Sequence, residues 1–126
     1  RLCMALPGCV NKAQSAFIHG RRISDNILPA QKLMRGFHLD SGEPRCAFNI
    51  DLFKAFVIVI WEFLWDALDL FSFPPRFSTW ICECVSSAMY SININGGLHG
   101  YFPRKMGLRQ GDPLSPHLSV ICMDVF

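Results

Sequence analysis

Apolar residues recur at the three- and four-residue spacing of an α-helix in four parts of the chain. The most regular stripe runs from Trp61 to Leu68, and the acidic residues of that stretch lie away from it, which predicts an amphipathic helix. An earlier helix is predicted to begin at a cap formed by Ser24 or Asp25. The four stripes consist of Ile27, Met34 and Phe37; of Trp61, Leu64, Trp65 and Leu68; of Phe77, Trp80, Ile81 and Cys84; and of Leu118, Ile121, Cys122 and Val125.

Alternation of apolar and polar residues predicts strands. Residues 45–52 place Phe48, Ile50 and Leu52 on one face of such a strand. Asp51 then points to the opposite face near the strand end, where a carboxylate can reach an open cleft. The alternative is that Asp51 caps the element that follows.

Residues 90–94 also alternate, and residues 98–102 return after Asn95-Gly96-Gly97, a turn sequence typical of β-hairpins. The order of helices and strands predicts one α+β unit without internal repeats. The aromatic residues at helical spacing are expected to belong to the core rather than to a base-stacking surface.

Composition agrees with a globular chain, because 51% of the 126 residues are hydrophobic and 17% are charged. This apolar content, together with a first residue that is not Met, suggests a piece of a larger protein. The longest fully apolar run, Ala55–Trp61, is far shorter than the roughly 20 residues of a membrane span. No membrane segment or targeting signal is visible in the sequence. The location stays unknown, with the nucleus and the cytoplasm as the intracellular alternatives.

The formal net charge of +2 does not by itself indicate nucleic-acid binding. Basic residues nevertheless gather at Arg21-Arg22 and at Arg104-Lys105, close before Arg109. Such clusters either contact phosphates or form solvated surface.

The six cysteines show no paired metal spacing, since Cys82-x-Cys84 has no second pair. Free thiols in a reducing compartment are therefore expected. The four histidines are scattered without the spacing of a zinc site, and no glycine-framed serine nucleophile is present. Hydrolase, zinc-enzyme and nucleotide-hydrolase functions lack support.

The stretch Gly107–Pro116 combines two glycines, a donor pair and two prolines. Gly107 and Gly111 permit positive φ angles and close approach of a ligand to the backbone. Arg109 and Gln110 offer hydrogen-bond donors between them. Ser115 is predicted as the cap of the following helix, with Pro116 at its first position. The alternative is a plain glycine-rich turn into a helix.

The order of these pieces resembles the reverse transcriptase domain of plant non-LTR (LINE-type) retrotransposons over nearly the whole chain. The matching stretches are Gln14-Ser15-Ala16-Phe17, Gly20-Arg21 and Asp25-Asn26-Ile27-Leu28 for a fingers motif; Phe48-Asn49-Ile50-Asp51 and Lys54-Ala55-Phe56 for the first palm motif; and Gly107–Pro116 for the second palm motif.

This resemblance implies RNA-templated DNA synthesis by nucleotidyl transfer with two Mg²⁺ ions. Its substrates would be an RNA template, a DNA primer and deoxynucleoside triphosphates. The implied fold is α+β, a partial fingers and palm of a right-hand polymerase with an incomplete palm sheet. Residues 1–45 would form the fingers part and residues 46–126 the palm part.

The resemblance also assigns roles to residues. Asp51 would be the catalytic metal ligand, assisted by the carbonyl of Leu52, since magnesium prefers oxygen ligands. Phe56 would exclude a ribose 2′-hydroxyl by its bulk, and Arg21 would face the triphosphate or the template. The triplet Arg109, Gln110 and Gly111 would support the template base and the incoming nucleotide.

The chain departs from the family at two important places. The paired Asp-Asp of the palm does not occur in the sequence, so the metal site would need the missing remainder of the polymerase. Val57 stands where the family usually has Asp. The competing hypothesis is a catalytically inactive retroelement remnant that at most binds nucleic acid.

Overall fold

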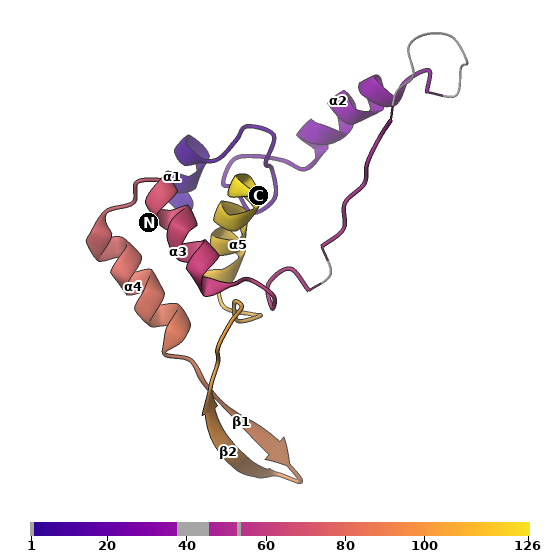
Figure 1. Ribbon diagram of the computed structural model, residues 1–126. Coiled ribbons are helices and arrows are strands. Elements are labelled where there is room, and N and C mark those ends of the chain that lie inside the picture. Colours follow the sequence, from indigo (N-terminus) through magenta and orange to yellow (C-terminus); the bar gives the residue numbers. More distant parts are fainter. Residues whose placement is uncertain (1, 38–45, 53) are drawn as a thin grey trace. The chain divides into compact units, whose positions relative to one another are not determined.

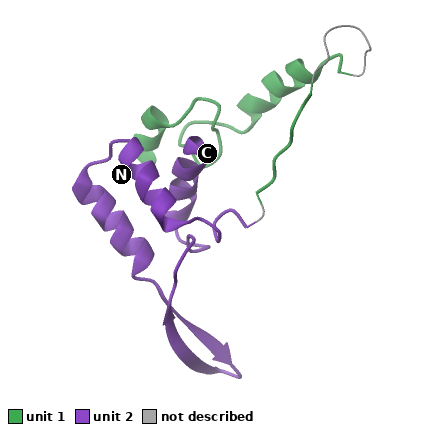
Figure 2. Ribbon diagram, in the orientation of Figure 1, with its two compact units in different colours: residues 1–53 green, residues 54–126 purple. Residues whose placement is uncertain are grey.

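The computed structural model describes residues 2–37, 46–52 and 54–126, which form two compact units, residues 1–53 and residues 54–126 (Figure 2). The units contain helices and one small sheet, in agreement with the predicted α+β class (Figure 1). The first unit contains α1 (Leu2–Cys9) and α2 (Ser24–Met34); the second contains α3 (Trp61–Leu70), α4 (Pro75–Ser86), β1 (Met89–Ile94), β2 (Gly97–Pro103) and α5 (Ser115–Val125).

The core of the second unit lies where α3 packs against both α4 and α5. Leu64 and Leu68 of α3 are fully buried, while the acidic residues of this helix are exposed, which confirms the amphipathic prediction. Helix α5 is buried more broadly than its predicted stripe, because Ser119 and Val120 are buried as well. Burial of each leucine, isoleucine or valine side chain in this core stabilises the fold by about 1.5–3 kcal/mol.

Helix α4 forms where it is predicted, but only part of its apolar stripe enters the core. Ile81 is buried, whereas Trp80 is 56% exposed and Cys84 is exposed. The guanidinium of Arg76 covers one part of the Trp80 ring at 5.1 Å from its centroid. The prediction that these aromatic residues are core is therefore wrong for Trp80.

Helix α2 forms where it is predicted but ends at Met34, before Phe37 of the predicted stripe, and it buries none of its residues. Its first residue is Ser24, and no side chain caps its N-terminus, so the predicted Ser24 cap is wrong. Asp25 instead accepts a hydrogen bond at 3.2 Å from the backbone N–H of Arg22, just before the helix.

The strand predicted over residues 45–52 does not form. Residues 46–52 have irregular backbone, residues 46–51 are exposed, and Arg45 lies outside the described residues. The reason is that a strand needs a neighbouring ladder, and the sheet within the described part of the chain pairs only β1 with β2. The alternation of Phe48 and Ile50 therefore leaves both side chains exposed.

The predicted hairpin is confirmed, with Asn95 and Gly96 as its two turn residues. Both have positive φ, 50° and 86°, as the turn type preferred in tight hairpins requires. The Asn93 carboxamide oxygen accepts a hydrogen bond from the Gly96 N–H at 3.0 Å. The hairpin extends away from the three helices of its unit (Figure 1).

Cys122 of α5 is 5% exposed, and burial raises the pKa of its thiol from 9.0 to about 11. We expect iodoacetamide to alkylate Cys122 at pH 8 at least about tenfold more slowly than the exposed Cys84, because the thiolate is the reactive form. Between pH 9 and 11 the unfolded chain would lose this proton first, so stability should fall as the pH rises through that range. Peptide mass spectrometry measures the rates; equal rates in the native protein would contradict the expectation, and urea should equalise them.

None of the helices among the described residues is long and apolar enough to cross a membrane.

Candidate nucleic-acid interface

The loop that begins at Gly107 is joined by hydrogen bonds to a segment some fifty residues earlier in the chain. The N–H of Gly107 donates to the carbonyl of Val59 at 2.7 Å, and the N–H of Leu108 donates to the carbonyl of Phe56 at 2.5 Å. The indole N–H of Trp61 donates to the Gly107 carbonyl at 2.9 Å. These three bonds hold the loop against the segment that carries Phe56.

Gly107 has a specific steric reason to be glycine. It is buried with φ at +82°, and an added Cβ would overlap the Val57 carbonyl oxygen and lie 2.6 Å from a terminal nitrogen of Arg104. Gly111 has φ at +83°, but nothing lies within 4 Å of the position its Cβ would take. At Gly107 the group that approaches the glycine closely is therefore the backbone of Val57 rather than a ligand. At Gly111 the space next to the backbone stays open.

Asp112 orders the end of the loop. Its side-chain oxygen accepts a hydrogen bond from the Leu114 N–H at 2.8 Å, and its carbonyl accepts one from the Ser115 N–H at 3.2 Å. Leu114 occupies the N-cap position of α5, so the prediction that Ser115 is the cap is wrong by one residue. The Asp112 carboxylate folds the chain just before the helix, and no side chain caps the helix itself.

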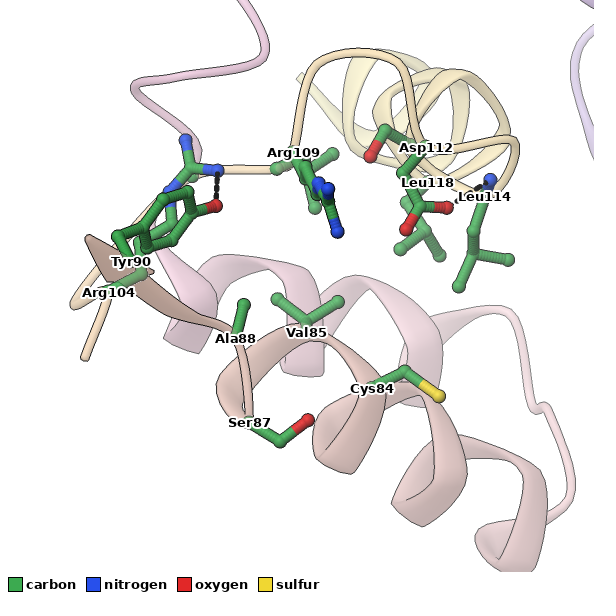
Figure 3. A pocket seen from close by; sticks show the side chains of 13 residues that line it. Cys84, Val85, Ser87, Ala88, Tyr90, Arg104, Arg109, Asp112, Leu114 and Leu118 are labelled. Carbon is green, nitrogen blue, oxygen red and sulfur yellow. Dashed lines mark hydrogen bonds between the residues drawn. The ribbon is translucent and has the colours of Figure 1, made fainter. Parts of the chain in front are cut away.

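Arg109 and Gln110 are both exposed at the tip of the loop. Arg109 extends toward a pocket of about 220 Å³, together with Asp112 (Figure 3). The opposite wall of this pocket includes Val85 of α4 and Ala88, which lies between α4 and β1. A second, more open groove beside the hairpin is also lined by Arg109 and Gln110.

Tyr90 and Phe102 also line this groove and carry no role in the sequence prediction. Arg104 lines it too and belongs to the basic cluster for which the sequence left phosphate contact or solvated surface open. Tyr90 and Phe102 lie opposite each other on β1 and β2. The Asn95-Gly96 turn reveals the hairpin in the sequence, but simple counting from that turn pairs Tyr90 with Tyr101 instead. A bulge in the hairpin shifts the partner of Tyr90 from Tyr101 to Phe102.

Arg21, predicted to face a triphosphate or the template, lies in the first unit and binds its own backbone. Its guanidinium donates to the carbonyls of Pro7, Val10, Asn11 and Gln14, at 2.9, 3.2, 2.5 and 2.7 Å. Four of the five N–H donors of an arginine are thereby engaged. These hydrogen bonds join the end of α1 to the turn that follows it.

Asp51 and Leu52 also belong to the first unit, and Asp51 is exposed on irregular backbone. A carboxylate and a neighbouring carbonyl have the chemistry that magnesium prefers. However, no group of three or more His, Cys, Asp or Glu side chains in the described ranges could hold a metal ion. Within the described part of the chain, these residues therefore do not make a complete magnesium site.

Comparison with known proteins identifies the class. The chain belongs to the reverse transcriptase (RNA-dependent DNA polymerase) family, whose model matches residues 3–126. It is similar to the transposon TX1 uncharacterized 149 kDa protein of Xenopus laevis, with 30% identity over 126 residues. That alignment covers all of this chain and 10% of the relative, so the chain spans about a tenth of the relative's length. No solved structure matches.

Proposed function

We propose that the chain supplies the part of an RNA-directed DNA polymerase that supports the template and the incoming nucleotide, within a retrotransposon of the non-LTR type. Its ligands would be an RNA template, a DNA primer and deoxynucleoside triphosphates. Membership of the family supports this proposal, as does the similarity to a transposon protein. In this proposal residues 1–45 are part of the fingers and residues 46–126 part of the palm of a right-hand polymerase.

The observation that carries the proposal is the backbone junction between the Gly107 loop and the Phe56 segment. Both stretches resemble reverse transcriptase motifs, and the hydrogen bond from Leu108 to Phe56 brings them side by side. An aromatic side chain that restricts the sugar and a loop that supports the base must act on the same nucleotide. The junction supplies the adjacency that such joint action requires.

Each exposed group of the loop then has a chemical task. The guanidinium of Arg109 offers paired donors that suit a phosphate. The carboxamide of Gln110 can donate to and accept from a base or a sugar hydroxyl. The open face of Gly111 admits a ligand close to the backbone, because no side chain of the chain occupies that space.

Asp51, with the Leu52 carbonyl, is proposed as one ligand of the divalent metal ions that this family normally uses. Such ions, when bound by a full set of carboxylates, activate the attacking hydroxyl and neutralise charge on the leaving group. A single exposed carboxylate does not hold such an ion tightly. Asp51 by itself therefore supports no catalytic step.

The second candidate function is nucleic-acid binding without catalysis, as in an inactive retroelement remnant. One observation favours it: the described residues contain no group of three or more His, Cys, Asp or Glu side chains that could hold a metal ion. Arg21 also retains little capacity for a triphosphate, because most of its donors bind backbone carbonyls. Both candidates share the loop as the binding element and differ in catalysis alone.

Replacement of Arg109 by alanine tests the binding role. We expect the variant to bind a fluorescein-labelled RNA–DNA template–primer about tenfold more weakly at low salt, with a salt slope smaller by about 0.9, as for one lost phosphate contact. Fluorescence anisotropy at several salt concentrations measures both quantities.

The matched control is Arg76→Ala, which removes the same charge from the exposed face of α4 outside the loop. Equal losses for the two variants would mean that only net charge matters. Absence of template–primer binding by the unaltered chain at low salt would refute the proposed function itself.

A further inference from the structure

An open groove of about 440 Å³ lies between the hairpin and the loop. It combines aromatic and cationic side chains and contains no carboxylate among its lining residues. The lining consists of Val57, Tyr90, Phe102, Arg104, Arg109 and Gln110.

A bulge in the hairpin creates the aromatic part of this groove. Between the pairs Ile92–His99 and Tyr90–Phe102, the single residue Ser91 of β1 stands against two residues of β2. One of these two is Gly100, whose φ of +70° fits a bulge position that favours glycine.

The bulge decides which ring faces the groove. Without it, the register would pair Tyr90 with Tyr101, and successive strand residues point to opposite faces. With it, the rings of Tyr90 and Phe102 stack at 6.3 Å between centroids and 27° between planes. Phe102 is 45% exposed, so part of its ring remains accessible to a ligand.

The cationic part of the groove is held next to these rings. Arg104 donates to the Tyr90 hydroxyl at 3.1 Å, and its guanidinium carbon lies 5.7 Å from the Tyr90 ring centroid (Figure 3). Arg109 is exposed and reaches the groove from the loop. Two guanidinium groups therefore line the groove together with the aromatic pair.

Stacking rings beside guanidinium groups form a surface that suits single-stranded nucleic acid, whose bases stack and whose phosphates are anionic. We propose that this groove binds a single-stranded polynucleotide, with a base against the Tyr90–Phe102 pair and phosphates at Arg104 and Arg109. The assignment rests on the proposed function, because the strand bound in the groove would be the template that the Gly107 loop supports. Unpaired template ahead of the primer end is the strand with this chemistry.

The experiment measures the affinity of the 126-residue chain for fluorescein-labelled single-stranded oligouridylate and oligodeoxythymidylate. Phe102→Leu keeps an apolar side chain but removes the ring, and we expect about tenfold weaker binding, within the range measured for loss of one base stack. Phe102→Trp should restore the affinity. Tyr101→Ala removes a ring from the neighbouring position, which is 76% exposed and does not line the groove, and should change the affinity less than twofold.

The outcomes separate this inference from the proposed function. If template–primer binding depends on Arg109 but Phe102→Leu and Tyr101→Ala have the same small effect, the groove proposal is overturned and the proposed function stands. If a polyglutamate peptide competes as well as the oligonucleotide, the groove recognises charge alone and the proposal fails.

Photocrosslinking gives a test that does not depend on variants. The unaltered chain is irradiated with 4-thiouridine-substituted RNA or 4-thiothymidine-substituted DNA, and the crosslinked peptide is identified by mass spectrometry. Crosslinks within residues 89–110 are expected, and crosslinks confined to other segments would overturn the assignment. The two arms show whether RNA, DNA or both occupy the groove.

Discussion

Replacement of Gly107 by alanine is expected to lower the free energy of unfolding by about 3 kcal/mol or more. The positive φ of this residue costs an L-amino acid roughly 1–2 kcal/mol. The new Cβ would also overlap the Val57 carbonyl, and overpacking of this kind typically costs about 1–3 kcal/mol. Two backbone hydrogen bonds and the Trp61 indole converge on this residue and its neighbour, so the loop has no easy way to move aside.

Gly111→Ala is the matched control, because it introduces the same methyl group at a nearly identical φ of +83° into open space. It should cost only about 1–2 kcal/mol, the conformational part of the effect. Urea denaturation followed by circular dichroism measures both variants. If the two substitutions destabilise the protein equally, contact with Val57 is not what restricts position 107.

Elements whose pattern is satisfied by neighbours inside one unit were predictable from the sequence. The stripe of α3 finds α4 and α5, and the Asn95-Gly96 turn closes β1 on β2 through contacts a few residues away. Residues 46–52 show the opposite case. Their alternation is as regular as that of β1, but a strand exists only with a partner, and their own pattern does not specify one.

The candidate site was predictable in its residue types and less so in its geometry. The glycines of the loop indicate positive φ correctly, yet the sequence does not reveal that Gly107 meets Val57 while Gly111 stays open. That difference arises from a contact across some fifty residues of chain. Likewise, a one-residue bulge decides that Phe102 rather than Tyr101 faces Tyr90.

Arg21 illustrates why residue type alone is a weak guide to a phosphate site. An arginine next to a glycine turn is typical of an anion-binding position, and it is equally suited to gather backbone carbonyls. In this chain α1 and the turn that follows it provide those carbonyls within hydrogen-bonding distance. The sequence does not specify locally how the segments that carry these carbonyls fold, so these hydrogen bonds were not predictable. The contact of Arg21 with a triphosphate or the template stays a prediction.

The second large effect concerns catalysis: the purified 126-residue chain is expected to extend no primer on an RNA template with Mg²⁺ and deoxynucleoside triphosphates. Nucleotidyl transfer needs several carboxylates around its metal ions. The sequence contains no adjacent Asp-Asp pair, and the described residues bring no metal-holding group together around Asp51. Template–primer binding through Arg109 should persist, so the same preparation should show binding by the loop without catalysis.

Denaturing gel electrophoresis of a labelled primer measures this result, with an unrelated active reverse transcriptase in a parallel reaction to show that the template–primer is competent. Asp51→Asn is the decisive comparison, because it removes the charge and keeps nearly the same shape. Extension by the unaltered chain that disappears in Asp51→Asn would refute the expectation and show that Asp51 finds its metal partners elsewhere in the chain. Extension that persists in Asp51→Asn would instead identify a contaminating polymerase, since one carboxylate fewer cannot leave a metal-dependent reaction of this chain unchanged.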